Sequence, residues 1–211
     1  ISGETNIDFP NICKYDFYSK LLDTNKAIEG KKIIHSISYC SFFVKKESLT
    51  NGKLTEEVIQ NYYKVLEDPL TNKYKDKKES MELYQKFEVE NGVVDVQNLT
   101  KAKSWILENI FQMEKWVDIK TKDYLKVIFE FPIEVLEKEF NRYTVPNMYN
   151  KNDFNVQVDK QIFGLPNQNM GMNAKKPFLE SKSKKVKVPY LISEEDAIAQ
   201  MLFFEYLLGF A

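Results

Sequence analysis

Residues 33–44, IIHSISYCSFFV, form a run of β-branched and aromatic side chains in which successive residues alternate between two sets. Ile33, His35 and Ile37 belong to one set, and Ile34 and Ser36 belong to the other. Such a run with period-two alternation predicts a β-strand. Asn51-Gly52 then predicts a turn, and residues 55–66 place apolar side chains at helical spacing ahead of Pro69. This part of the chain is therefore expected to contain a strand followed by a helix.

The rest of the chain continues the mixture of helix and strand patterns. Helices are expected over residues 73–87, 99–117, 133–143 and 194–208. Trp105 lies on the apolar stripe of the helix expected over residues 99–117. Pro132 is expected to open the helix over residues 133–143, and Ser193 to cap the helix over residues 194–208. Strands are expected over residues 124–131, 154–158, 161–165 and 184–192, with a hairpin turn at Asp159-Lys160. Asn98 is expected to be a helix N-cap. The prediction is an α+β fold with small antiparallel sheets, hairpins and several packed amphipathic helices.

Three regions follow from this order of elements. Residues 1–150 are a mixed strand and helical region, residues 151–192 a basic hairpin and loop module, and residues 193–211 the start of a C-terminal helical region. We expect them to form one continuous domain of a longer protein.

The composition limits the classes of function. The chain has 211 residues, a net charge of −1 and 43% hydrophobic residues, enough to bury a core. Cys13 and Cys40 are isolated, without the CxxC pairs of a zinc site, and fit a reducing, cytoplasmic compartment. No apolar stretch reaches the roughly 20 residues of a membrane span. Phosphate-binding glycine motifs are absent, so we expect no cofactor and no nucleotide-driven catalysis. His35 is interpreted as structural, with a lone general base as the alternative.

The charge is strongly concentrated in residues 164–190, GLPNQNMGMNAKKPFLESKSKKVKVPY. This lysine segment carries a net charge of +5, which leaves about −6 for the rest of the chain. Its cations are Lys175, Lys176, Lys182, Lys184, Lys185 and Lys187, which are interpreted as contacts to a phosphate backbone. Arg142 is the only arginine, so phosphates would be held by lysine point charges. The alternative is a solvated loop whose lysines confer solubility.

The segment also contains side chains suited to reading base edges. Gly164 and Gly171 would let backbone approach a ligand closely, and Phe178 or Tyr190 would offer a ring for stacking, with core packing as the alternative for both. Paired donors and acceptors come from Asn167, Gln168, Asn169 and Asn173. Residues 167–173 are therefore interpreted as a reading loop, next to the phosphate-contacting lysines.

Two runs carry a family resemblance. Residues 164–180, GLPNQNMGMNAKKPFLE, together with residues 31–46, KKIIHSISYCSFFVKK, resemble the large subunit of type I-B CRISPR surveillance complexes (Cascade), of which this chain would be a fragment. The resemblance implies a noncatalytic role in RNA-guided antiviral defence. Such subunits contact the protospacer-adjacent motif in target DNA, aid strand opening and enable recruitment of the helicase-nuclease. Implied partners are target DNA, the crRNA-containing complex and the other Cascade subunits, without a membrane.

Two other functions remain open at this level. Glu114, Asp118 and Lys120, with Asp123 beyond, resemble the carboxylate and lysine set of a Mg²⁺-dependent nuclease, although a solvated helix end explains the same residues. A protein-interaction scaffold is the other alternative, in which the lysine segment binds an acidic partner. We expect a protein that is not an enzyme.

Overall fold

The computed structural model describes residues 9–22, 24–115, 118, 122–149, 152–159, 161–165 and 191–208. The fold is α+β, as the sequence predicted. The helices are α1 (Phe9–Phe17), α2 (Glu56–Glu67), α3 (Pro69–Asn72), α4 (Lys78–Asn91), α5 (Val96–Asn109), α6 (Ile133–Asn147) and α7 (Glu194–Leu208). Short 3-10 turns are η1 (Thr24–Lys26), η2 (Lys46–Leu49), η3 (Ile110–Lys115) and η4 (Asn152–Phe154).

The strands form two small antiparallel sheets. In the first, β1 (Ser41–Lys45) pairs with β2 (Tyr124–Ile128), with Ser41 opposite Ile128. In the second, β4 (Gln161–Gly164) lies between β3 (Val156–Val158) and β5 (Ile192–Ser193). The chain divides into two compact units, residues 1–76 with 88–143 and residues 77–87 with 144–211. The three regions proposed from the sequence stay a prediction.

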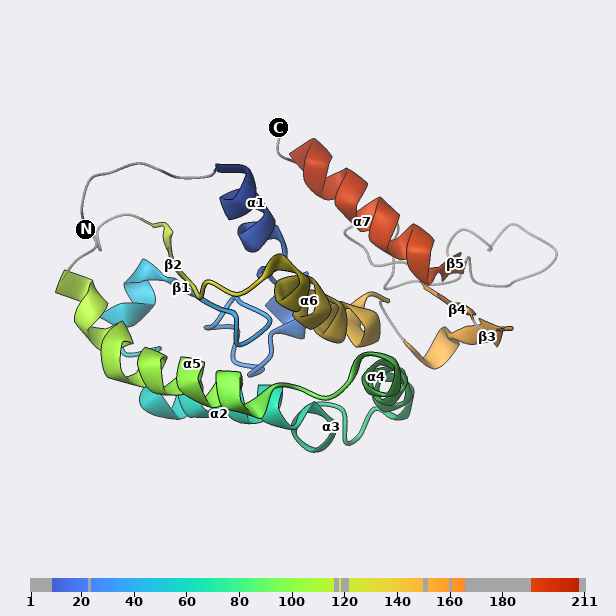
Figure 1. Ribbon diagram of the computed structural model, residues 1–211, viewed down its shortest axis with the longest axis horizontal. Coiled ribbons are helices and arrows are strands. Elements are labelled where there is room, and N and C mark those ends of the chain that lie inside the picture. The colour runs from blue at the N-terminus through green and yellow to red at the C-terminus, as the bar shows by residue number, and fades with distance from the viewer. Residues whose placement is uncertain are drawn as a thin grey trace. The chain divides into compact units, whose positions relative to one another are not determined.

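The first unit is built around α2, which lies alongside α5 (Figure 1). The helix begins after Thr55, whose hydroxyl accepts a hydrogen bond from the backbone N–H of Val58, and it ends before Pro69 as predicted. Its buried face meets β1, where the ring of Phe42 lies 5.9 Å from that of Tyr62 and 6.5 Å from that of Tyr63. Burial of these large rings stabilises this unit.

The prediction of one long strand over residues 33–44 is wrong. Only Ser41–Lys45 form a strand, and the chain before it folds back so that Ile34 pairs with Val44. Serine hydroxyls explain the turn, because Ser36 Oγ accepts from the backbone N–H of Phe43 and Ser38 Oγ accepts from that of Cys40. Such side-chain to backbone bonds compete with the hydrogen bonds of a regular ladder.

Other boundaries shift in the same region of the chain. The helix expected over residues 73–87 is α4, which begins later, and the one expected over residues 99–117 is α5, which begins earlier and gives way to η3. Asn98 is not the N-cap of α5. Asp95 is, because its carboxylate accepts from the backbone N–H of Asn98 at 3.0 Å and from the amide of the same residue at 2.8 Å.

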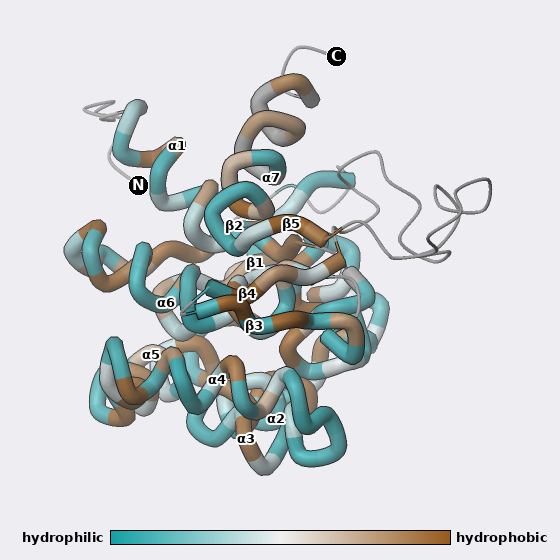
Figure 2. Tube along the Cα trace, turned by 90° about the vertical axis from the view of Figure 1, so that its right-hand side faces the viewer, coloured by the Kyte–Doolittle hydropathy of each residue, from teal (hydrophilic) through white to brown (hydrophobic). Residues whose placement is uncertain are grey.

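The second unit confirms the predicted hairpin and the predicted last helix. β3 and β4 are joined through Asp159, whose φ of 54° is the left-handed conformation of a tight turn. Ser193 Oγ accepts from the backbone N–H of Asp196 and so caps α7. Figure 2 shows hydrophilic colour in the first turn of α7 and hydrophobic colour along its later turns, where Phe203 and Leu207 are exposed. None of the helices within the described residues has both the length and the hydrophobicity to cross a bilayer.

Candidate functional site

The residues predicted to bind nucleic acid lie outside the described part of the chain. They are Asn167, Gln168, Asn169, Gly171, Asn173, Lys175, Lys176, Lys182, Lys184, Lys185 and Lys187, and Phe178 and Tyr190 lie outside it as well. The structure does describe Gly164, the first residue of the lysine segment, and Ile192, two residues beyond its end. Gly164 in β4 pairs directly with Ile192 in β5, so the segment begins and ends at neighbouring strands of one sheet. Residues 165–191 therefore form the connection between two paired strands.

Gly164 has a different role from the one expected of it. A Cβ atom on Gly164 would lie 2.5 Å from Cγ of Tyr149 and 2.6 Å from Oδ1 of Asn155. The close approach is therefore to a side chain of the protein and not to a ligand. Tyr149 links β4 to β5, because its hydroxyl oxygen lies 2.8 Å from the backbone carbonyl oxygen of Ile162 and 3.3 Å from that of Ile192. The single hydroxyl proton is shared between these two acceptors.

Arg142, the only arginine in the sequence, makes its contacts within the first unit. The side chain of Arg142 is buried, its Nε lies 3.1 Å from the carboxylate of Glu139, and one terminal nitrogen donates to the backbone carbonyl of Gly92 at 3.0 Å. Glu88 lies 3.6 Å from the other terminal nitrogen. Burial raises the pKa of the Glu139 carboxyl, and the guanidinium of Arg142 opposes that shift. Arg142 therefore stabilises the fold, and its guanidinium is engaged by groups of the protein itself.

The carboxylates proposed for a nuclease belong to no three-residue metal site within the part of the chain that the structure describes. Lys120 lies outside the described residues, and Asp123 forms an ion pair of 3.7 Å with Lys46. Within the described ranges, no three His, Cys, Asp or Glu side chains are placed to hold a metal ion. The arrangement of the described carboxylates therefore gives the nuclease hypothesis no support.

His35 has an aromatic neighbour. Its ring lies 5.1 Å from the ring of Tyr124 in an edge-to-face arrangement, and its Nδ1 lies 3.4 Å from the Tyr124 hydroxyl. Burial lowers the pKa of His35, and the charge of Lys45 lowers it further. The imidazole is therefore neutral at physiological pH. Its contacts are those of a packed structural residue, the interpretation made from the sequence.

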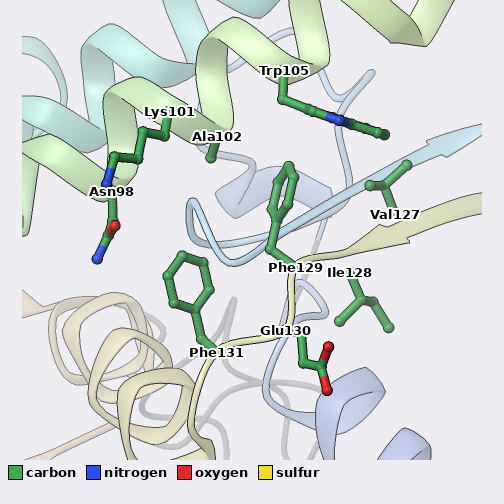
Figure 3. A pocket seen from close by; sticks show the side chains of 9 residues that line it. All are labelled: Asn98, Lys101, Ala102, Trp105, Val127, Ile128, Phe129, Glu130 and Phe131. Atoms are coloured by element: carbon green, nitrogen blue, oxygen red, sulfur yellow. The ribbon is translucent and has the colours of Figure 1, made fainter.

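A cleft of about 440 Å³ lies in the first unit, between α5 and the end of β2 (Figure 3). Its helix side consists of Asn98, Lys101, Ala102 and Trp105. Its strand side consists of Val127, Ile128, Phe129, Glu130 and Phe131. Clefts of this volume accept small molecules or single side chains and nucleotides.

Aromatic rings dominate the cleft. The ring of Trp105 meets that of Phe129 edge to face, with the centroids 5.6 Å apart. Past β2 the chain turns tightly, because the backbone N–H of Phe131 donates to the carbonyl of Phe129 at 2.9 Å. Figure 3 shows the rings of Phe129 and Phe131 both directed toward α5. The ring of Phe131 also packs edge to face against the ring of Tyr39, with the two centroids 5.6 Å apart.

Sequence reasoning missed this cleft. Trp105 was assigned to the apolar stripe of its helix, but 39% of its surface is exposed. Phe129 and Phe131 were placed in a strand that ends earlier, at Ile128. The available signal was the presence of Lys101 and Trp105 one turn apart on a single helix face. Comparisons with known protein families, with curated proteins and with solved structures found no match to this chain.

Proposed function

We propose that the chain is a noncatalytic, nucleic-acid-binding subunit of an RNA-guided CRISPR interference complex. It contacts target DNA near the protospacer-adjacent motif, aids strand opening and helps recruit the helicase-nuclease. The observation that carries the proposal is the charge distribution, in which one 27-residue segment holds six lysines against a single Glu180 in a chain of net charge −1. The resemblance of residues 164–180 and 31–46 to the large subunit of type I-B complexes supplies the biological context.

The surrounding structure supports this division of labour in two ways. The pairing of Gly164 in β4 with Ile192 in β5 brings together the residues on either side of the lysines, which suits a surface that presents them to a ligand. Since Arg142 is buried and paired, cationic contacts to phosphate fall to lysines. Exposed Phe203 and Leu207 on α7 suit a contact with another Cascade subunit of the crRNA-containing complex.

Salt dependence of DNA binding tests the proposal. If about four phosphates are neutralised, the logarithm of the association constant should fall with the logarithm of salt concentration at a slope of about −3.6. Replacing Lys184, Lys185 and Lys187 together by Ala should make that slope shallower by about 2.7 and weaken binding. The matched control replaces Lys75, Lys77 and Lys78, three exposed lysines outside the segment, and should bind as the wild type does. Equal affinity and slope in both triple variants would overturn the proposal.

The reading loop is tested with the same measurement on two duplexes. Replacing Asn169 and Asn173 by Ala should reduce discrimination between a correct and an incorrect adjacent motif, because bidentate amide contacts contribute about 1–3 kcal/mol each. Binding to the incorrect duplex should change little. Equal losses on both duplexes would show that these amides contact only the backbone.

A further inference from the structure

We propose that the cleft between α5 and the end of β2 binds one unstacked nucleotide of a single-stranded nucleic acid, with the base between the aromatic rings and the phosphate at Lys101. The proposal rests on the proposed function for the class of polymer involved. It concerns a different surface, made only of described residues of the first unit and lying apart in sequence from the lysine segment.

The first argument is that the aromatic rings lining the cleft are partly exposed to solvent, although rings of this size are usually buried in a hydrophobic core. Trp105 is 39% exposed although Leu99, Ala102 and Ile106 on the same helix are buried. Phe129 and Phe131 are partly exposed on the facing side. Each of these rings packs edge to face against another ring, which limits the orientations open to it. Preformed aromatic surfaces of this kind stack on bases of any sequence.

The second argument is the placing of polar groups at one end of the cleft. Asn98, Lys101 and Trp105 follow one another at spacings of three and four residues, so they share one face of α5. The amide nitrogen of Asn98 donates to Asp95, which fixes the side chain in position. Lys101 is exposed, and Figure 3 shows it extending toward Asn98. A cation and an oriented amide beside aromatic rings match the phosphate, the polar edge and the flat face of a nucleotide.

The third argument is the charge balance of the cleft. Its two charged residues are Lys101 and Glu130. Figure 3 shows the carboxylate of Glu130 pointing to the opposite side of the chain from the rings of Phe129 and Phe131. Lys101 is therefore the cation among the lining residues, and the carboxylate of Asp95, which accepts from Asn98, lies outside the lining. An anionic aromatic ligand is favoured over an apolar peptide side chain, which would gain nothing from Lys101.

Tryptophan fluorescence measures occupancy directly. The chain has two tryptophans, so a Trp116→Phe variant leaves Trp105 as the only reporter. In this background nucleoside monophosphates and single-stranded oligodeoxythymidylate should quench the emission as the base stacks beside Trp105. The corresponding nucleosides should bind about two- to fivefold more weakly, since they lack the phosphate that Lys101 contacts.

Substitutions in the same background separate stacking from charge. Phe131→Leu should weaken monophosphate binding about fivefold or more. Phe131→Tyr keeps an aromatic ring at this position and should bind monophosphates as tightly as the protein with Phe131 does. Lys101→Ala should lower monophosphate affinity to that of the nucleoside and leave nucleoside affinity unchanged. Lys103→Ala on the same helix, outside the cleft lining, is the matched control and should change neither.

The outcomes distinguish this inference from the proposed function. Replacing Lys184, Lys185 and Lys187 should leave quenching by free monophosphates unchanged, because these lysines are not part of the cleft. Absence of quenching by every monophosphate and oligonucleotide, in protein with a native circular dichroism spectrum, would overturn the cleft inference while DNA binding by the lysine segment stands. A shift of the Trp105 emission maximum on adding a blocked leucine peptide, with no response to nucleotides, would overturn it too, in favour of a protein-docking cleft.

Discussion

Tyr62 and Tyr63 are consecutive residues of α2 that are both completely buried but differ in the contacts of their hydroxyls. The Tyr62 hydroxyl donates to the backbone carbonyl of Ser38 at 2.8 Å and lies 3.0 Å from Ser36 Oγ. Among the described residues, the Tyr63 hydroxyl has no hydrogen-bond partner. Burial raises the pKa of both phenols, so both remain protonated at any physiological pH. One hydroxyl thus anchors the turn before β1, and the other is buried without compensation.

The same substitution at these two positions should have different effects. Tyr62→Phe should lower the free energy of unfolding by about 1–3 kcal/mol, because it leaves the Ser38 carbonyl buried without its donor. Tyr63→Phe should leave that free energy unchanged within about 0.5 kcal/mol or raise it, since it removes an unpaired polar group. Urea denaturation followed by circular dichroism measures both. Equal destabilisation by the two substitutions would show that the hydrogen bonds of Tyr62 are not the source of the difference.

At the scale of the element, the three-stranded sheet depends on one residue without a side chain. Gly164 in β4 leaves the space that the ring of Tyr149 occupies, and Tyr149 packs with Met148, Ile192 and Ala197 in the core of the second unit. The sheet, the ring and α7 therefore form one packed cluster. The same cluster holds the two ends of the lysine segment.

Gly164→Ala should disturb that cluster. The added methyl group would overlap the ring, and overpacking of this kind costs about 1–3 kcal/mol. Hydrogen exchange of the backbone amides in β4 and β5 should therefore accelerate. Val158→Ala, at an exposed position of β3, is the control and should leave exchange close to that of the wild type. Unchanged exchange in Gly164→Ala would mean that Tyr149 moves aside at little cost.

At the scale of the molecule, the two cysteines report how the first unit opens. Cys13 is exposed on α1, and Cys40 is completely buried between the turn and β1. Burial raises the pKa of the Cys40 thiol, and the nearby carboxylate of Glu139 adds to the shift. A thiol that is both shielded and protonated reacts slowly, because the thiolate is the nucleophile.

Thiol labelling should therefore occur in two phases. Ellman's reagent should modify one thiol per chain quickly in the native protein, and the second only as denaturant opens the first unit. Cys13→Ser should remove the fast phase, and Cys40→Ser the slow one. Two fast thiols in the native wild type would contradict a closed core around Cys40.

The elements that sequence reasoning located best are those with local signals. α2 lies between the capping Thr55 and Pro69, and the β3–β4 hairpin turns at Asp159, so their patterns and end signals agree. The strand expected over residues 33–44 was wrong because serine hydroxyls bond to the backbone there. Periodicity counts apolar side chains and does not register such bonds.

The sequence by itself determined the mixed α+β class, the position of α2 and the hairpin, and the concentration of positive charge in residues 164–190. Only the tertiary structure decided that the buried guanidinium of Arg142 donates to the carbonyl of Gly92, that Gly164 makes room for Tyr149, and that Trp105 stands exposed beside Phe129. The physical reason is the sequence separation over which each interaction acts. Caps, turns and periodicity act within a few residues, whereas these contacts join residues that are 15 to 50 positions apart and exist only when the chain has packed.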